Sequence, residues 1–376
     1  MTGGAQPLSP GMAAPVKPGL WLVARTRYAL HRRAALLALA VLLAVSLLAL
    51  RAPAPPPATG APEARAEEQT DVVLYQSIVE QLRHGGLYYP TTATLLRAGN
   101  YPLKPFVTFR LPTLAVVQSL LPEPAVVALL YLLAAGTAYA WYRALAPAFT
   151  RAPPRAVAVL LLFAGLAVFV QEELRWFHEI WAGLLIALSL GCWRPGRWVE
   201  AVALGCAAAL IREIAVLYLG VMLLAALADR RWREAIGWGV AIAVLAAALA
   251  AHAAAVARVV RLLDPASPGW HGLLGPGFFV RIMTISTSLR LAPPVLAAPL
   301  VALALWGWAA WRSPLALRVC GLFAAFALLL SLFGRVDTFY WGLLCAGLLP
   351  VGLAFVPDAL RECLARRRRI TIRRMA

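Results

Sequence analysis

The sequence predicts an all-α protein: a polytopic transmembrane helical bundle of about ten spans, with amphipathic interfacial helices in a large first external loop. Two observations predict this class. Hydrophobic residues make up 62% of the 376 residues and charged residues only 14%, and the mean hydropathy of +0.75 lies outside the range of soluble globular domains. Apolar runs of near-spanning length also recur along most of the chain, whereas an outer-membrane barrel would show short alternating strands.

The distribution of charge predicts the orientation. The net charge is +18, and cations gather at both ends of the chain, before the first apolar run and after the last. Because the cytoplasmic flanks of membrane spans are enriched in Lys and Arg, both termini are expected in the cytoplasm, which requires an even number of crossings. The two clusters are expected to touch anionic lipid headgroups, so membrane lipids, and not nucleic acid, are the expected partners of this charge.

Three regions follow from these patterns. Residues 1–33 are expected to be a disordered basic cytoplasmic N-terminus, residues 34–360 a single transmembrane bundle that includes an external loop at 51–124, and residues 361–376 a basic cytoplasmic tail. The ordinary spans are expected at about Ala34–Leu50, Ala125–Tyr142, Ala156–Val170, Trp181–Trp193, Ala235–Ala254, Val295–Trp311, Val319–Phe333 and Leu343–Phe355.

Two segments need a separate interpretation. Val199–Ala228 has basic flanks on both sides, so one crossing cannot satisfy the charge rule; two short helices that meet externally at Arg212 and Glu213 can. Short helices at membrane depth are tolerated where they line a protein-enclosed or watery cavity. Phe278–Leu291 is ambiguous and is interpreted as an interfacial or partly inserted helix, which leaves about ten crossings.

The first external loop contains a predicted helix of its own. Thr70 is expected to cap a helix that runs from Asp71 to about Arg83 and stops at Gly85 and Gly86. Its polar side predicts a helix that lies along the interface.

With this topology, many ionisable residues face the external side. Ionisable groups near membrane depth are candidates for function by default, because keeping them there is costly. The set comprises Glu67, Glu68, Asp71, Lys104, Arg110, Glu172, Glu173, Arg175, His178, Glu179, Arg212, Glu213, His271 and Asp337.

Each strong candidate also has a purely structural interpretation. A carboxylate at Asp71 is favoured in a first helical turn by the helix dipole, and Arg212 with Glu213 could be a buried ion pair. His178 and His271 are first interpreted as interfacial hydrogen-bonding residues, since two histidines on separate loops do not make a metal site. The five cysteines show no metal or redox spacing. The metal site is therefore unassigned, no cofactor is predicted with certainty, and a divalent cation stays open.

Four strings resemble the bacterial multi-pass members of the GT-C superfamily, membrane glycosyltransferases that use lipid-linked sugar donors: YPLKPFVTFRLPT, WFHEIWAGLLIALSL, LIREIAVLYL and DTFYWGLL. In that superfamily a catalytic acidic residue follows the first span in a large external loop, and Asp71 matches that position. The resemblance covers the bundle from the first span to about Leu360. The chain departs from the pattern because it lacks an unmistakable DxD or paired acidic motif in this loop, which leaves a metal requirement open.

The resemblance implies a transfer reaction at the external membrane face. A sugar would pass from a polyprenyl-phosphate donor to a glycan, lipid or protein acceptor of the cell envelope, with Asp71 as the general base. The high content of Ala, Arg and Pro indicates a GC-rich bacterial gene, so the protein would lie in the bacterial inner membrane with a periplasmic site.

The same resemblance assigns substrate-binding roles by chemistry. Lys104, Arg110 and Arg212 would hold the departing phosphate. Aromatic rings, those of Tyr75, Trp176 and Trp181, would stack on sugar faces. The full set expected to bind substrate is Tyr75, Lys104, Arg110, Trp176, His178, Glu179, Trp181, Arg212, Glu213 and His271.

Other functions stay open. A multi-pass transporter or a lipid or glycan flippase would also use broken helices and charges near the membrane, although the chain shows no internal repeat and its charges gather at one face. A membrane acyltransferase or polymerase of envelope glycans, and a non-catalytic assembly protein that tolerates substitution of Asp71, are further alternatives. The chain has no Walker loop, dinucleotide fingerprint, HExxH or GxSxG motif, which argues against nucleotide-driven transport and the common hydrolases.

Overall fold

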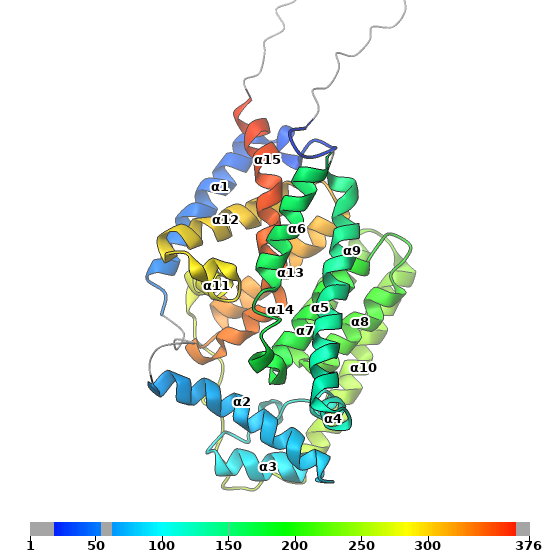
Figure 1. Cartoon of the computed structure of the whole chain (residues 1–376), viewed down its shortest axis with the longest axis vertical. Coiled ribbons are helices and arrows are strands. Elements are labelled where there is room, and N and C mark those ends of the chain that lie inside the picture. The colour runs from blue at the N-terminus through cyan, green and yellow to red at the C-terminus, as the bar shows by residue number, and fades with distance from the viewer. Residues whose placement is uncertain (1–18, 54–61, 150, 366–376) are drawn as a thin grey trace, which may run out of the picture.

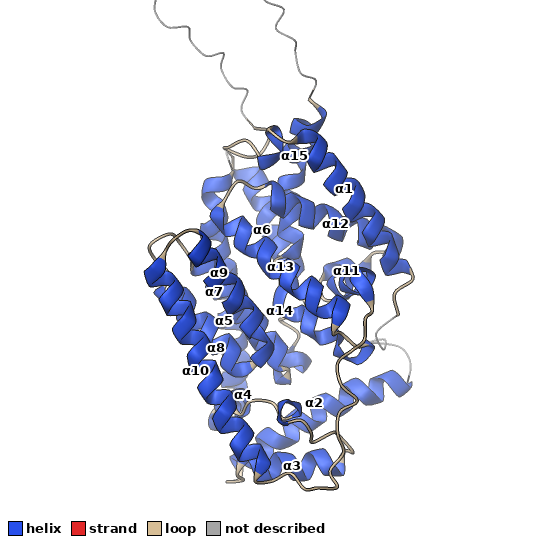
Figure 2. Cartoon of the chain, turned by 180° about the vertical axis from the view of Figure 1, so that it is seen from behind, coloured by secondary structure: helices blue, strands red, loops and turns tan. Residues whose placement is uncertain are grey.

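The protein is an elongated bundle of helices (Figure 1). A computed structural model describes residues 19–53, 62–149 and 151–365, and within residues 62–70 it describes the backbone only. Every regular element in these ranges is a helix, which confirms the predicted all-α class. Helices α2, α3 and α4 lie at one end of the bundle, and α15 and the start of α1 lie at the other (Figures 1 and 2).

The α-helices are α1 (Arg32–Leu47), α2 (Pro62–Arg83), α3 (Tyr88–Ala98), α4 (Thr113–Leu120), α5 (Glu123–Leu145), α6 (Ala152–Leu166), α7 (His178–Cys192), α8 (Val199–Ile211), α9 (Val216–Ala228), α10 (Trp232–Ala257), α11 (Gly275–Ile285), α12 (Pro294–Ala310), α13 (Pro314–Leu332), α14 (Leu343–Ala346) and α15 (Val356–Leu364). Short 3-10 helices connect them: η1 (Arg27–Ala29), η2 (Leu48–Leu50), η3 (Phe106–Thr108), η4 (Ala146–Ala148), η5 (Glu172–Trp176), η6 (Glu213–Ala215), η7 (Ser288–Leu291), η8 (Val336–Gly342) and η9 (Leu349–Phe355).

Four helices of the described chain are long and apolar enough to cross a membrane. A fifth crossing is reached if the bent pair near the C-terminus, whose two parts meet at 50°, counts as one span. Six other apolar helices have only 10–17 residues. Helix length and composition thus support four or five crossings, and the predicted number of about ten is not confirmed. The four are Arg32–Leu50, Glu123–Ala148, Trp232–Ala257 and Pro314–Leu332.

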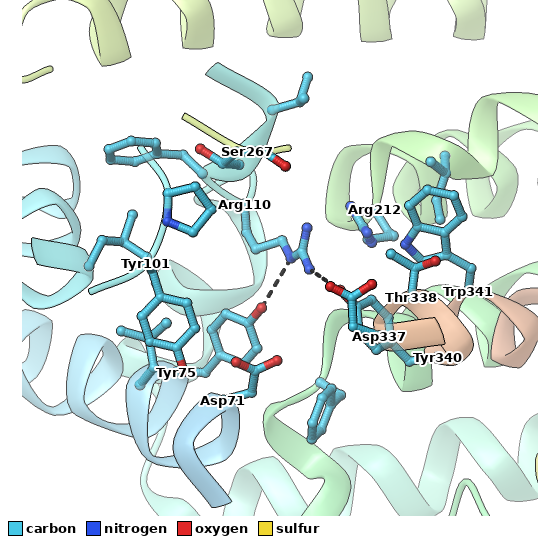
Figure 3. A pocket seen from close by; sticks show the side chains of 18 of the residues that line it. Asp71, Tyr75, Tyr101, Arg110, Arg212, Ser267, Asp337, Thr338, Tyr340 and Trp341 are labelled. Atoms are coloured by element: carbon cyan, nitrogen blue, oxygen red, sulfur yellow. Dashed lines mark hydrogen bonds between the residues drawn. The ribbon is translucent and has the colours of Figure 1, made fainter. Parts of the chain in front are cut away.

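The chain breaks at Arg212, as the charge pattern predicts. α8 ends at Ile211, and the backbone of Arg212 is extended, with φ −137° and ψ 106°. After the break, η6 and α9 carry the chain back toward the end of the bundle from which α8 began. α8 and α9 both pack against α10. The break places Arg212 (Figure 3) and Glu213 near residues of α2.

The last expected span, Leu343–Phe355, is not one regular helix, and its crossing depends on whether the bent pair counts as one span. The region is divided into η8, α14 and η9, and α15 follows after the bend. Glycines allow this path: a Cβ at Gly352 would lie 2.0 Å from the carbonyl oxygen of Ala304, and one at Gly165 would lie 2.0 Å from that of Gly347. The irregular chain is therefore inserted against the backbones of α12 and α6, where a larger side chain has no room.

Phe278–Leu291 lies in α11 and η7, and α11 has only 11 residues. Phe278, Ile282 and Met283 are fully buried, and α11 packs against α12, α13 and η2. At about 1.5 Å per residue, such a helix is too short to cross a bilayer by itself. It is buried in the bundle and does not cross by itself, which agrees with the expected partly inserted helix, and its position relative to the membrane interface stays a prediction.

The helix of the first external loop is longer than expected. α2 begins at Pro62, not at Asp71, so Thr70 lies inside the helix and is not its N-cap. A proline is well placed in a first turn, and the sequence EARAEEQT that follows is rich in good helix formers. The expected stop is confirmed, since α2 ends at Arg83 and Gly85 has φ +87°. Leu74, Ile78 and Val79 of α2 pack into a small apolar cluster with α3 and the end of α10.

The N-terminal boundary also differs from the expectation of disorder up to residue 33. Backbone N–H groups of Trp21 and Leu22 donate to the Asp358 carboxylate at 2.7 and 2.8 Å, and that of Thr26 donates to Glu362 at 3.0 Å. Two carboxylates of α15 thus hold residues 19–26 in place. α15 itself extends to Leu364, past the expected start of the tail at 361. The remaining parts of both terminal regions, residues 1–18 and 366–376, lie outside the described residues.

Two loops at the α2 end of the bundle are joined by hydrogen bonds. Leu103 donates its N–H to the Pro265 carbonyl at 2.9 Å, and Ser267 donates to the Lys104 carbonyl at 2.7 Å. Arg97 donates to both carboxylate oxygens of Asp264, at 2.8 and 2.6 Å. The connection after α10 is therefore fixed to α3 and to the chain that follows it.

Arg97→Gln is expected to speed hydrogen exchange of residues 258–274 at neutral pH and to make that exchange less sensitive to acid. The hydrogen bonds from Arg97 lower the pKa of Asp264 below its ordinary value of 3.8. Because the folded-state pKa is lowered, this contribution to stability is present above the ordinary pKa and is lost as the pH falls through the folded-state value. Hydrogen exchange of this loop, compared with wild type at each pH, should be faster in the variant at neutral pH, with the difference shrinking on acidification. Equal exchange at neutral pH would contradict this role.

Candidate functional site

A cavity of about 720 Å³ opens at the α2 end of the bundle (Figure 3). Its walls come from parts of the chain far apart in sequence: α2, α3, the segment after α3, the break between α8 and α9, the loop after α10, and η8. Six of the candidate residues predicted from the sequence line it together: Asp71, Tyr75, Arg110, Arg212, Glu213 and Asp337.

Arg110 occupies the centre of the cavity between two tyrosines (Figure 3). Its Nε donates to the Tyr75 hydroxyl at 3.1 Å and its Nη2 to the Tyr340 hydroxyl at 3.4 Å. None of the ion pairs formed by the described side chains includes Arg110, so no described carboxylate lies within 4.0 Å of its guanidinium. A guanidinium held by neutral hydroxyls beside a cavity can accept an anionic group, phosphate above all, as its counter-ion.

Asp71 lies one helical turn before Tyr75 on α2 and faces the same cavity (Figure 3). Burial raises the pKa of the Asp71 carboxyl above 3.8, while a hydrogen bond from Tyr101 and the charge of Arg110 oppose that rise. A carboxylate with a raised pKa is a stronger base than an exposed one. Asp71 can therefore take a proton from a group bound in the cavity, close to the cation of Arg110.

Arg212 is already neutralised by carboxylates from two elements. Its Nε donates to Glu179 of α7 at 2.5 Å, and its Nη1 bonds to the neighbouring Glu213. Arg212 is 2% exposed and Glu179 1%. Two carboxylates around one guanidinium favour the structural interpretation, in which a buried ion-pair cluster fixes the broken helix to α7. Arg212 is therefore less suited than Arg110 to bind phosphate.

Glu179→Gln is expected to destabilise the fold by about 3 kcal/mol, because it removes one charge from a buried pair. This loss of stability lies at the lower end of the range for breaking a buried ion pair, because Glu213 still forms an ion pair with Arg212. Thermal and denaturant unfolding in detergent would measure it. Glu172→Gln is a suitable control, because this exposed partner of Arg175 should contribute under about 1 kcal/mol. Equal losses in the two variants would contradict the buried-pair interpretation.

Three predicted residues lie outside the cavity wall because backbone carbonyls or the core hold them. The Lys104 ammonium donates to the Leu262 carbonyl at 2.9 Å. The Trp181 indole donates to the Arg175 carbonyl at 2.7 Å. Trp176 is buried in the apolar cluster beneath α2. None of the three lines the cavity, and the phosphate role of Lys104 and the sugar-stacking roles of both tryptophans stay predictions.

The two histidines are also placed away from the cavity wall. His178 is buried behind Tyr75, with ring centroids 5.1 Å apart at 67°, so it supports the position of that tyrosine. His271 is exposed on the loop after α10. Neither is placed to touch a ligand in the cavity directly.

The cavity also contains residues to which the sequence gave no role. Arg335 donates to Asp337 at 3.0 Å through Nε and to Ser267 at 3.3 Å through Nη1. Tyr340 and Tyr101 add hydroxyls beside Arg110 and Asp71. Asp337 and Tyr340 fall in DTFYWGLL, so a signal existed, but nothing in the sequence places this string against the first external loop.

A metal site is not formed by the described side chains. No group of three or more His, Cys, Asp or Glu residues among them could hold a metal ion. The side chains of Glu67 and Glu68, which precede Asp71, lie outside the described part. A divalent cation thus stays an open prediction.

Comparisons with protein-family models, with curated proteins and with solved structures found no match to this chain. The GT-C resemblance therefore rests on the chain's own residues.

Proposed function

We propose that this chain is an integral-membrane glycosyltransferase that moves a sugar from a polyprenyl-phosphate donor to a cell-envelope acceptor at the external membrane face. One observation supports this above the others: Asp71 and Arg110 face one cavity, and no carboxylate among the described side chains forms an ion pair with Arg110 within 4.0 Å. The pair supplies a base and an anion-binding group side by side, which are the two groups that the transfer needs.

In the proposed reaction, the Asp71 carboxylate takes the proton of an acceptor hydroxyl. The acceptor oxygen then bonds to the anomeric carbon of the sugar, and the bond from that carbon to the donor phosphate oxygen breaks. The phosphate leaves with an additional negative charge, which Arg110 stabilises. The acidic proton stays on Asp71 until it is released to water.

The remaining walls fit a lipid-linked sugar. Tyr75, Tyr101 and Trp270 offer aromatic faces and polar edges for a sugar ring. Leu329 and Phe333 line the cavity from α13 and its end, and the same helix exposes Leu328 and Leu332 outside the cavity. This apolar surface on a membrane-length helix suits the polyprenyl chain of the donor.

The proposed topology places this cavity on the periplasmic side of a bacterial inner membrane, with both termini in the cytoplasm and about ten crossings. It is supported by contacts at the opposite end of the bundle. Arg151, in the connection between α5 and α6, donates to the Leu20 carbonyl, and Arg27 donates to the Ser313 carbonyl between α12 and α13. These connections therefore lie beside the N-terminal segment, and they carry the basic residues of the positive-inside pattern. The bent pair near the C-terminus and the five short apolar helices that lie outside the first external loop would supply the additional crossings as part of the packed bundle.

A transporter or flippase is the second candidate, because the break at Arg212 puts an ion pair inside an apolar region, as in broken transporter helices. The base and the anion-binding guanidinium at one end of the bundle favour transfer over transport.

The proposal is tested by sugar transfer from a panel of radiolabelled polyprenyl-phosphate sugars, with purified wild type and Asp71→Asn. Folding of both proteins is checked by their thermal unfolding. Transfer by wild type and its loss in the variant are expected. No transfer from any donor by a well-folded wild type would favour the transporter instead.

A further inference from the structure

A second cavity, of about 680 Å³, lies between the end of α5 and the start of α6. Its wall contains two cations, Arg151 and Arg155, and no acidic residue. The Arg151 contact with Leu20 places it at the end of the bundle opposite the proposed active site. This cavity has no part in the proposed reaction.

The cations of this cavity are not neutralised by the described side chains. Arg151 and Arg155 form no ion pair there, and neither does nearby Arg143, which contacts only Tyr139 by hydrogen bond. The Arg155 guanidinium lies 3.7 Å from the centroid of the Tyr142 ring, and its Nε is buried with no hydrogen-bond partner. A guanidinium that is not compensated by a carboxylate can accept an anionic ligand as its counter-ion.

The helix geometry adds to this positive potential. Arg151 is the N-cap of α6, a helix of 15 residues, and its side chain makes no capping hydrogen bond. The first turn of α6 presents the positive end of its dipole to the cavity, but Pro153 and Pro154 carry no N–H, so an anion would be held by the arginine side chains and not by the backbone. An anion at this position would be attracted by two guanidinium groups and by the helix together.

An exposed apolar surface continues from the cavity along α6. Val157, Leu160 and Phe163 recur at a spacing of three residues, so they lie on one side of the helix, and all three are exposed. Leu160 also lines the cavity. A ligand whose charged group lies in the cavity would thus have an apolar part beside it on the helix surface.

We propose that this cavity binds an anionic phospholipid of the surrounding membrane. Arg151 and Arg155 hold the headgroup phosphate, and the acyl chains lie along Leu160 and Phe163. Basic pockets between helices on the cytoplasmic side are typical sites for anionic headgroups. The inference needs the chain to lie in a membrane but does not depend on the proposed transfer reaction.

The test is native mass spectrometry of the full-length chain in detergent, titrated with phosphatidylglycerol and, separately, with neutral phosphatidylcholine. Wild type is expected to retain one phosphatidylglycerol more tightly than phosphatidylcholine. Arg155→Gln should weaken the binding of that lipid about fivefold, and Arg151→Gln combined with Arg155→Gln more strongly. The control Arg233→Gln, an exposed cation at the start of α10, should change it less than about twofold.

Leu160→Gln provides an independent variant, because it keeps both arginines and changes an exposed position whose loss cannot unfold the core. It should weaken the retained phosphatidylglycerol as well. Unchanged affinity in the double arginine variant and in Leu160→Gln would overturn the proposal. Displacement of the lipid by millimolar inorganic phosphate would also overturn it, since the site would then belong to a soluble anion.

Discussion

Asp71→Asn is expected to lower the rate constant of sugar transfer by about 100- to 10,000-fold, the usual contribution of a general base. Asn has nearly the same shape as Asp but cannot take the acceptor's proton. The donor phosphate contacts Arg110 and not Asp71 in the proposed complex, so donor affinity should change little. Single-turnover transfer and equilibrium donor binding, measured on the same preparation, separate the two quantities.

The pH dependence of the wild type provides a second measure of Asp71. Burial raises the pKa of its carboxyl, and only the ionised form is a base. Transfer should therefore be low in acid, increase as the pH rises through the raised pKa, and level off above it. Asp71→Asn should remove this increase. A matched control is Glu80→Gln, which changes an exposed carboxylate of the same helix and should keep both the rate and the pH profile.

Arg110→Gln is expected to lower kcat/KM by about 100- to 1,000-fold, because it removes the charge-assisted hydrogen bonds to the leaving phosphate. Arg110→Lys keeps the charge but loses the planar fork that Tyr75 and Tyr340 orient, so it should recover only part of the activity. Donor binding, measured with a polyprenyl phosphate that carries no sugar, should weaken in both variants.

Two control variants separate binding from positioning. Tyr340→Phe removes one hydroxyl that Arg110 contacts but leaves the charge, so its effect should be smaller than that of Arg110→Lys. Arg258→Gln removes an exposed cation just beyond α10 and should leave kcat/KM unchanged. Unchanged phosphate binding in Arg110→Gln would remove Arg110 from the proposed mechanism.

Much of the fold could be predicted from the pattern of charge and hydropathy. The break at Arg212 follows from basic flanks on both sides of one apolar segment, and the end of α2 follows from Gly85. The interruption after Leu343 could not be predicted from a local pattern, because it depends on contacts of Gly352 with Ala304 and of Gly347 with Gly165, across long distances in sequence. The predicted start of α2, Asp71, is nine residues late. Thr70 favours an N-cap, but the residues before it are good helix formers, and the helix includes them.

The candidate site could be predicted only in part, for a similar reason. Asp71, Tyr75 and Arg110 all lie in the first external loop, so the composition of that one segment was enough to predict them as site residues. The approach of Tyr340 to Arg110 joins residues 230 positions apart, and only the fold reveals it. The hydrogen bonds of Lys104 and Trp181 could not be predicted, because their partners are backbone carbonyls, which any residue offers and which leave no mark in the sequence.

The most direct test of the central claim is single-turnover transfer from one radiolabelled polyprenyl-phosphate sugar already bound to wild type and to Asp71→Asn. The proposal predicts that both proteins bind the donor with similar affinity, that wild type transfers the sugar to an acceptor when it is added, and that the variant keeps the donor intact. Equal transfer by both proteins would contradict the role of Asp71. Movement of the intact donor across a proteoliposome membrane by wild type, with no cleavage of its sugar–phosphate bond, would contradict the enzyme itself.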